Sequence, residues 1–149
     1  MFEQTAEPKV LTIKHVFNAP PERVFRAWTE PALLMQWFRA APNFKTIIAE
    51  VDLKVGGRYR LGMQPPESDL THIAVGEYQA IKPNEQLVFT WAWEGAEDDQ
   101  TLVTIDFLPS GGNTEVVLTH ENFKTDEARE SHGEGWRGCL AALEEFILS

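Results

Sequence analysis

The sequence predicts a single α+β domain in which a curved antiparallel sheet wraps around one long C-terminal helix. Between residues 46 and 121, apolar residues mostly recur with a period of two, which is typical of strands that bury one face. Turn-forming residues interrupt this pattern at short intervals. From Thr125 onward the period changes to three and four, which indicates an amphipathic helix that can cover the apolar face of the sheet.

Length and composition narrow the class of protein. The 149 residues, 43% hydrophobic and 24% charged, fit one globular domain over residues 1–149 and exclude a chain that stays disordered. A net charge of −10 repels phosphate backbones, so nucleic acid is not an expected partner. Cys139 is the only cysteine, so no intramolecular disulfide forms, and a cytoplasmic location is expected. Residues 1–9 lack the features of a secretory signal, and no membrane span is predicted.

Proline positions define the first elements. Residues 10–17 are rich in β-forming side chains and predict a strand that ends before Pro20. Because proline is tolerated in the first turn of a helix, Pro21–Thr29 is predicted as a short amphipathic helix. Pro31 begins a second short helix, which a kink separates from the first. Its apolar positions are Leu33, Leu34, Trp37 and Phe38.

Six more strands are predicted in the middle of the chain. Glycine, proline and asparagine separate them in turns so short that consecutive strands must be antiparallel neighbours. One face of these strands is apolar and the other polar, so one face is buried. The predicted strands cover residues 46–53, 58–63, 71–81, 86–93, 101–108 and 114–121.

The last segment supplies the cover for the buried face. Thr125 is a good N-cap, and the acidic residues Asp126 and Glu127 are favoured in the first turn by the helix dipole. An apolar stripe about 100° wide follows, which suits a helix lying in the hollow of the sheet. The stripe consists of His132, Trp136, Cys139, Leu140, Leu143, Phe146 and Ile147.

A single helix cannot fill the hollow of a wide twisted sheet, so the sequence predicts a cavity at one end. Walls of large apolar and aromatic side chains with a few polar groups are typical of a small-molecule pocket. Each aromatic residue could instead simply fill the core, because aromatic side chains dominate protein cores. The predicted lining consists of Trp37, Tyr59, Phe89, Trp91, His120, His132, Trp136 and Leu140.

His120 and His132 are the candidates for chemistry, since imidazole titrates near neutral pH. One lies near the end of the last strand and the other in the first turns of the long helix. If both faced the cavity, acid/base catalysis would be possible, whereas hydrogen-bonded structural histidines are the alternative. His15 and His72 are predicted to be structural.

Neither a metal site nor a cofactor site is predicted. The four histidines are widely spaced, and no HExxH or CxxC pattern occurs. Gly56 and Gly57 have no lysine and no helix N-terminus behind them, so a tight turn explains them better than a phosphate loop. A cysteine on the inner stripe of a helix, such as Cys139, is usually an inert apolar group.

Several motifs occur in a specific order over nearly the whole chain. With them, the sequence resembles a single-domain bacterial family named for homology to an activator of heat-shock protein 90 ATPase, within the START-like SRPBCC superfamily. The motifs are AP-x-x-x-VF-x-AW at 19–28 with Leu34 and Trp37, GG-x-Y at 56–59, LVFTW at 87–91, and LTH at 118–120 followed by Phe123, His132, Gly135, Trp136 and Leu140.

The resemblance implies the helix-grip fold, also called START-like or Bet v-like, with one strand, two helices, six strands and a final long helix. It also implies a deep cavity between the sheet and this helix, which the superfamily uses for lipids, hormones, polyketides and other apolar molecules. The resemblance supplies neither a ligand nor catalytic residues, because fold alone does not define function.

Three functional hypotheses follow. The first is a protein that binds a small apolar or aromatic molecule. The second is a cyclase-like or hydratase-like enzyme that uses a cavity histidine, and the third is a co-chaperone-like interaction domain or a homodimer. Eukaryotic activators that resemble this domain carry an additional N-terminal chaperone-binding domain, for which 149 residues leave no room, so chaperone activation is not expected.

Overall fold

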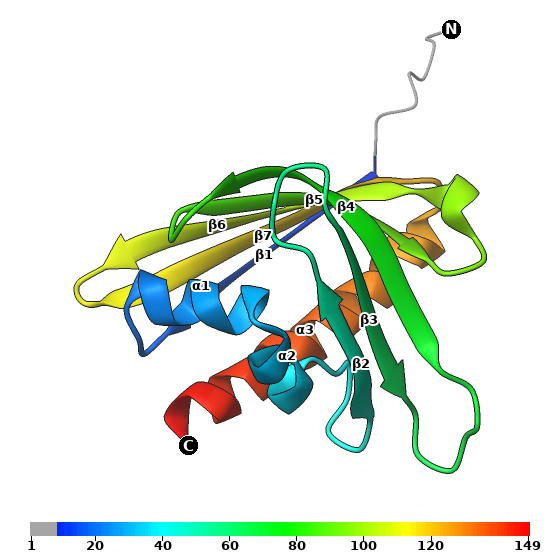
Figure 1. Ribbon diagram of the computed structural model, residues 1–149, viewed down its shortest axis with the longest axis horizontal. Helices are drawn as coiled ribbons and strands as arrows, with labels where there is room; N and C mark the ends of the chain where they lie inside the picture. The colour runs from blue at the N-terminus through cyan, green and yellow to red at the C-terminus, as the bar shows by residue number, and fades with distance from the viewer. Residues whose placement is uncertain (1–8) are drawn as a thin grey trace, which may run out of the picture.

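The computed structural model describes residues 9–149, and Figure 1 shows a curved sheet with helices on its concave side. The order of one strand, two helices, six strands and a long helix confirms the predicted fold class. The prediction that residues 1–9 are not a secretory signal concerns mainly residues 1–8, and these lie outside the described residues. The elements are β1 (Lys9–Phe17), α1 (Pro21–Thr29), α2 (Pro31–Trp37), β2 (Lys45–Val51), β3 (Arg58–Gln64), β4 (His72–Lys82), β5 (Gln86–Trp93), the 3-10 helix η1 (Glu97–Asp99), β6 (Thr101–Ser110), β7 (Asn113–Phe123) and α3 (Asp126–Leu148).

All seven strands belong to one antiparallel sheet with the order β1-β7-β6-β5-β4-β3-β2. From β2 to β7, each strand pairs with the next one along the chain, as expected for short turns. The first strand pairs with the last, placing Ile13 opposite Leu118. The strand that precedes α1 and the strand that precedes α3 are therefore neighbours at one edge of the sheet.

Strands β4 and β5 approach each other closely at Gly76. A Cβ atom at this position would lie 1.9 Å from the carbonyl oxygen of Thr90, so a glycine is required there. The alternation of the sequence places Thr90 on the solvent face, but its side chain is buried. The reason is local hydrogen bonding, because the backbone N–H of Glu77 donates to the Thr90 hydroxyl at 2.8 Å and the Tyr59 hydroxyl donates to the Thr90 carbonyl.

Helices α1 and α2 fill one end of the hollow with aromatic side chains. Trp28 of α1 and Trp37 of α2 meet edge to face, with ring centroids 4.9 Å apart. The indole N–H of Trp37 donates to the carbonyl oxygen of Ala27 at 2.9 Å, which locks the two short helices together. Phe25 of α1 also meets Phe107 of β6 edge to face at 5.3 Å. Aromatic rings therefore pack the interior of this end of the hollow.

Helix α3 lies across the concave side of the sheet (Figure 1). It begins as predicted, because the Thr125 hydroxyl accepts a hydrogen bond from the backbone N–H of Ala128 at 3.0 Å. Gly138 allows α3 to approach the segment after α2, where a Cβ atom would lie only 1.8 Å from the carbonyl oxygen of Ala40. Within residues 9–149, no helix is long and apolar enough to cross a membrane.

Candidate ligand-binding cavity

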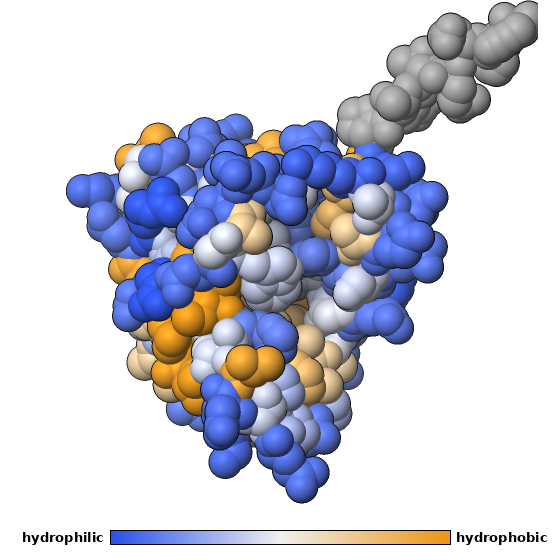
Figure 2. Space-filling model, turned by 90° about the vertical axis from the view of Figure 1, so that its right-hand side faces the viewer, coloured by the Kyte–Doolittle hydropathy of each residue, from blue (hydrophilic) through white to orange (hydrophobic). Residues whose placement is uncertain are grey.

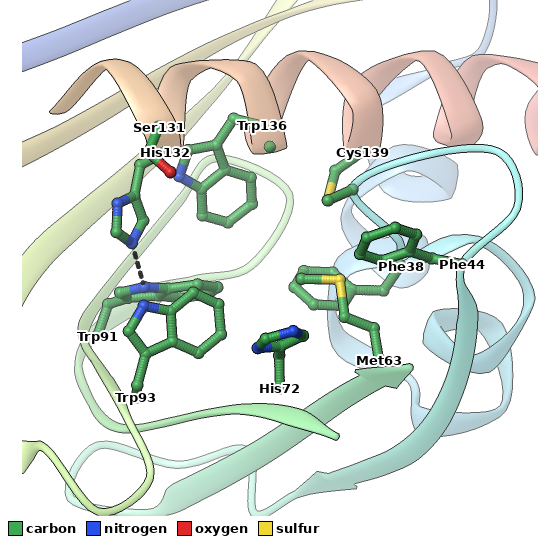
Figure 3. Close-up of a pocket in the computed structure, with 12 residues that line it drawn as sticks. Phe38, Phe44, Met63, His72, Trp91, Trp93, Ser131, His132, Trp136 and Cys139 are labelled. Carbon is green, nitrogen blue, oxygen red and sulfur yellow. Dashed lines mark hydrogen bonds between the residues drawn. The ribbon is translucent and has the colours of Figure 1, made fainter. Parts of the chain in front are cut away.

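A cavity of about 200 Å³ lies between the first half of α3 and the inner face of β3, β4 and β5 (Figure 3). The segment after α2 closes a third side. Figure 2 views the molecule from the side of the β3–β4 turn and the start of α3, and shows hydrophobic and near-neutral surface around a hollow, framed by hydrophilic side chains. The lining residues are Phe38, Ala40, Phe44, Met63, His72, Trp91, Trp93, Ser131, His132, Gly135, Trp136 and Cys139.

Aromatic rings form most of the cavity wall. The ring centroid of Trp91 lies 5.0 Å from that of Trp136 and 5.6 Å from that of Trp93. Phe38 approaches from the opposite side, 6.3 Å from Trp91 and 6.2 Å from Trp136. The described residues that line the cavity include no lysine, arginine, aspartate or glutamate. The wall therefore suits an apolar molecule better than one that needs an ion pair.

His132 is the polar group on the α3 side of the wall. Its Nδ1 lies 2.8 Å from the carbonyl oxygen of Ala128, which can only accept, so the ring proton belongs on Nδ1. Its Nε2 then accepts a hydrogen bond from the indole N–H of Trp91 at 3.3 Å (Figure 3). Partial burial lowers the pKa of His132. The imidazole is therefore neutral at physiological pH, and both ring nitrogens have partners.

His120 of β7 holds the opposite tautomer. The indole N–H of Trp136 donates to His120 Nδ1 at 2.9 Å, so the ring proton lies on Nε2 and is donated to the Thr101 hydroxyl at 2.6 Å. That hydroxyl donates in turn to the carbonyl oxygen of Trp91 at 3.0 Å. Burial, with a smaller effect from neighbouring His132, lowers the pKa of His120 to about 3. This fully buried ring positions Trp136 rather than facing the cavity.

The eight predicted lining residues fall into three groups. Trp91, His132 and Trp136 lie on the wall of the cavity. Tyr59 and Phe89, again with Trp91 and Trp136, surround a second and much smaller space of about 20 Å³ deeper under the sheet. The remaining three, Trp37, His120 and Leu140, are buried in the core and line neither space, because neighbouring helices and strands pack against them. Ligand binding by any of the eight stays a prediction.

Other wall residues were not predicted as lining. Met63 and Trp93 lie on the inner face that the alternation of the strands defines, so a signal for them existed. Ala40 and Phe44 belong to the irregular segment between α2 and β2, where no periodicity indicates a direction. His72 was predicted to be structural, but it lies at the start of β4 on the cavity rim, with its ring centroid 6.1 Å from that of Trp93.

Metal binding and catalysis by the Cys139 thiol find little support in the geometry. Across residues 9–149, no three His, Cys, Asp or Glu side chains come together in a way that could hold a metal ion. The thiol of Cys139 borders the cavity, but burial raises its pKa to about 12. A thiol in this state is a neutral apolar group at physiological pH and a poor nucleophile.

The sheet, the gripping helix and the hollow between them define a helix-grip protein of the SRPBCC superfamily. The family described as Activator of Hsp90 ATPase homolog 1-like protein matches the chain over residues 18–147. The protein therefore belongs to this family, as the sequence motifs predicted. A comparison with curated proteins finds no significant match.

Several solved structures share the fold over nearly the whole chain. Protein CV1439 from Chromobacterium violaceum is 26% identical, with a TM-score of 0.80 over 93% of this chain and 96% of its own. A protein from Rhodobacter sphaeroides is also 26% identical, with a TM-score of 0.79 over 93% of this chain and 92% of its own. An AHSA1-like protein from Aeromonas hydrophila is 23% identical, with a TM-score of 0.79 over 93% of this chain and 92% of its own. At this identity, the likeness supports only the fold.

Proposed function

We propose that this protein binds a small apolar or aromatic molecule in the cavity between α3 and the sheet. The observation that carries the proposal is the wall itself, in which three indole rings and two phenyl rings surround a space of about 200 Å³. Filling such a space removes apolar surface from water, which contributes about 25 cal/mol per Å² before ordering costs. Ser131 and His72 supply the few polar groups that would orient a ligand.

The state of the histidines favours binding over catalysis. A general acid or base must reach the substrate with a free nitrogen, and it works best with a pKa near the operating pH. Both ring nitrogens of His120 and of His132 already have hydrogen-bond partners, and both pKa values are lowered. The cyclase-like or hydratase-like alternative is therefore the weaker hypothesis.

Two further proposals come from the sequence alone. The single buried cysteine fits a reducing compartment, so we propose a cytoplasmic location. A homodimer or a protein partner is a separate hypothesis, which sedimentation of the purified protein and a pull-down from cell lysate test independently of the cavity.

The cavity can be blocked from α3 without disturbing the helix. Gly135 lies on the cavity wall, and a Cβ atom there would meet only the Cβ of Ala40, at 3.8 Å. A Gly135→Leu substitution therefore places its side chain in the cavity, while leucine is the better helix former by about 0.8–1 kcal/mol. The matched control is Ala141→Leu, which adds the same side chain to the exposed side of α3.

The probe is N-phenyl-1-naphthylamine, a neutral aromatic dye whose emission rises in apolar surroundings. We expect its emission to increase on addition of the wild-type protein and of the Ala141→Leu variant, and to remain low with Gly135→Leu. Circular dichroism of all three proteins confirms that they are folded. Equal dye binding by Gly135→Leu and the wild type, or no dye binding by the wild type, would refute the proposal.

A further inference from the structure

We infer that the cavity selects a ligand whose buried group is a weakly hydrated organic cation, such as a trimethylammonium group attached to an aromatic ring. The inference rests on the proposed function, because it names the chemistry of the molecule that the same cavity binds. Its basis is the attraction between a cation and the negative face of an aromatic ring, which is strongest for tryptophan.

The arrangement of the rings supports this choice. Such attraction acts within about 6 Å of the ring centroid. The centroid of Trp91 lies 5.0 Å from that of Trp136 and 5.6 Å from that of Trp93, so the three rings are adjacent, and a group on the cavity side of one ring is also near the others. Figure 3 shows these three indoles on one side of the space and the rings of Phe38 and Phe44 on the other. The sulfur atoms of Met63 and Cys139 complete a soft, polarizable wall.

Two of the hydrogen-bond donors on the cavity wall are already used and cannot serve an anionic ligand. A carboxylate or phosphate needs donors, yet the indole N–H groups of Trp91 and Trp136 are already donated to His132 and His120. The wall residues within the described chain include no lysine or arginine to pair with a negative charge. What the two tryptophans offer a ligand is therefore their ring surface, which attracts positive charge.

The wider distribution of charge points the same way. A net charge of −10 gives the molecule a field that attracts cations and repels anions. Arg39 lies near Cys139 but does not line the cavity. Its guanidinium group donates to the carbonyl oxygen of Gln36 at 3.2 Å and lies 4.0 Å from the Glu145 carboxylate. Its charge is therefore partly balanced outside the cavity.

The test compares two molecules of nearly the same shape. Phenyltrimethylammonium carries a positive charge on its branched group, whereas tert-butylbenzene has an uncharged carbon atom at the same place. Each is titrated against the protein loaded with N-phenyl-1-naphthylamine, and the loss of dye emission reports displacement. We expect the cation to displace the dye at a concentration about tenfold lower than the hydrocarbon, which corresponds to about 1.4 kcal/mol.

Variants of Trp93 separate ring attraction from the general field of the protein. This half-buried side chain lies at the cavity wall, so its replacement leaves the core intact. We expect Trp93→Leu to lose most of the preference for the cation over tert-butylbenzene, measured as the ratio of the two displacement concentrations, and Trp93→Phe to keep part of it. A variant that merely loosened the fold would weaken the binding of both molecules equally and leave their ratio unchanged.

The outcomes distinguish this inference from the proposed function. If tert-butylbenzene displaces the dye as well as the cation does, or if neither displaces a dye that binds, the inference is overturned while the binding function stands. If Trp93→Leu keeps the full preference for the cation, ring attraction is not its source and the inference also fails. If the dye does not bind at all, the proposed function fails and the inference fails with it.

Discussion

Gly138 and Gly135 lie one turn apart on α3, and the structure predicts opposite effects for the same substitution at the two positions. Replacing a glycine inside a helix with alanine stabilises the helix by about 0.8–1 kcal/mol. At Gly135, the new methyl group meets only the Cβ of Ala40, at an ordinary contact distance of 3.8 Å. We therefore expect Gly135→Ala to gain most of this energy and to raise the melting temperature by about 2–4 °C.

At Gly138, the new Cβ atom would lie 1.8 Å from the carbonyl oxygen of Ala40 and 2.6 Å from its carbonyl carbon. Both are backbone atoms, so the segment after α2 must move by well over an ångström. Overpacking of this kind costs about 1–3 kcal/mol or more, which exceeds the gain in helix propensity. We expect Gly138→Ala to be less stable than the wild type and to melt several degrees lower.

The assay is urea and thermal unfolding followed by far-ultraviolet circular dichroism, with the two variants and the wild type measured side by side. Because the change in helix propensity is the same at both positions, the difference between the variants reports the contact with Ala40 alone. A Gly138→Ala variant as stable as Gly135→Ala would show that α3 does not press against this segment. The contact between α3 and Ala40 on this side of the cavity would then be absent.

Two more predictions concern the hydrogen bonds behind the cavity. The pKa of His120 is about 3 in the folded protein, whereas that of an unfolded histidine is about 6.5. Between these pH values the unfolded state binds more protons. The free energy of unfolding is therefore largest above pH 6.5 and falls by about 1.4 kcal/mol per pH unit below it. Urea unfolding at pH 7 and pH 5.5 should therefore show a larger loss in the wild type than in His120→Gln, and equal losses would contradict the assignment. The Trp136→Phe substitution leaves the buried Nδ1 of His120 without its donor. Trp28→Phe is the control, since Trp28 Nε1 has no hydrogen-bond partner among the described residues. We expect Trp136→Phe to lose about 1–3 kcal/mol more unfolding free energy than Trp28→Phe. Equal losses of unfolding free energy would show that the bond to His120 contributes nothing.

The fold could be predicted from the sequence because each of its signals is local. Prolines begin α1 and α2, a threonine caps α3, and the alternation of apolar residues identifies which side of each strand is buried. The pairing of β1 with β7 joins segments far apart in the chain, so no local signal in the sequence predicted it. One local error, Thr90, arose where hydrogen bonds between side chains and backbone groups of β3, β4 and β5 accompany the burial of a side chain on the outer face.

The candidate site was only partly predictable, because alternation gives the direction of a side chain but not how far along the hollow it lies. Trp91 and His120 both point inward, yet Trp91 reaches the cavity while His120 ends against Trp136. Trp37 points inward as well, but it lies at the end that α1 and α2 fill. Phe44 could not be found at all, since an irregular segment has no period from which to infer a direction.

The same hydrogen bonds explain why the space beside α3 is not simply filled by the tryptophans around it. A large aromatic ring beside an apolar cavity gains contacts by turning into it. Trp91 and Trp136 cannot do so without breaking the bonds from their indole N–H groups to His132 and His120. Breaking the buried bond from Trp136 to His120 would leave a donor and an acceptor without partners, at a cost of about 1–3 kcal/mol for each group, and breaking the part-buried bond from Trp91 to His132 would cost less. The two histidines therefore serve the cavity as anchors for its walls, and their neutral state is what allows each of them to accept an indole proton.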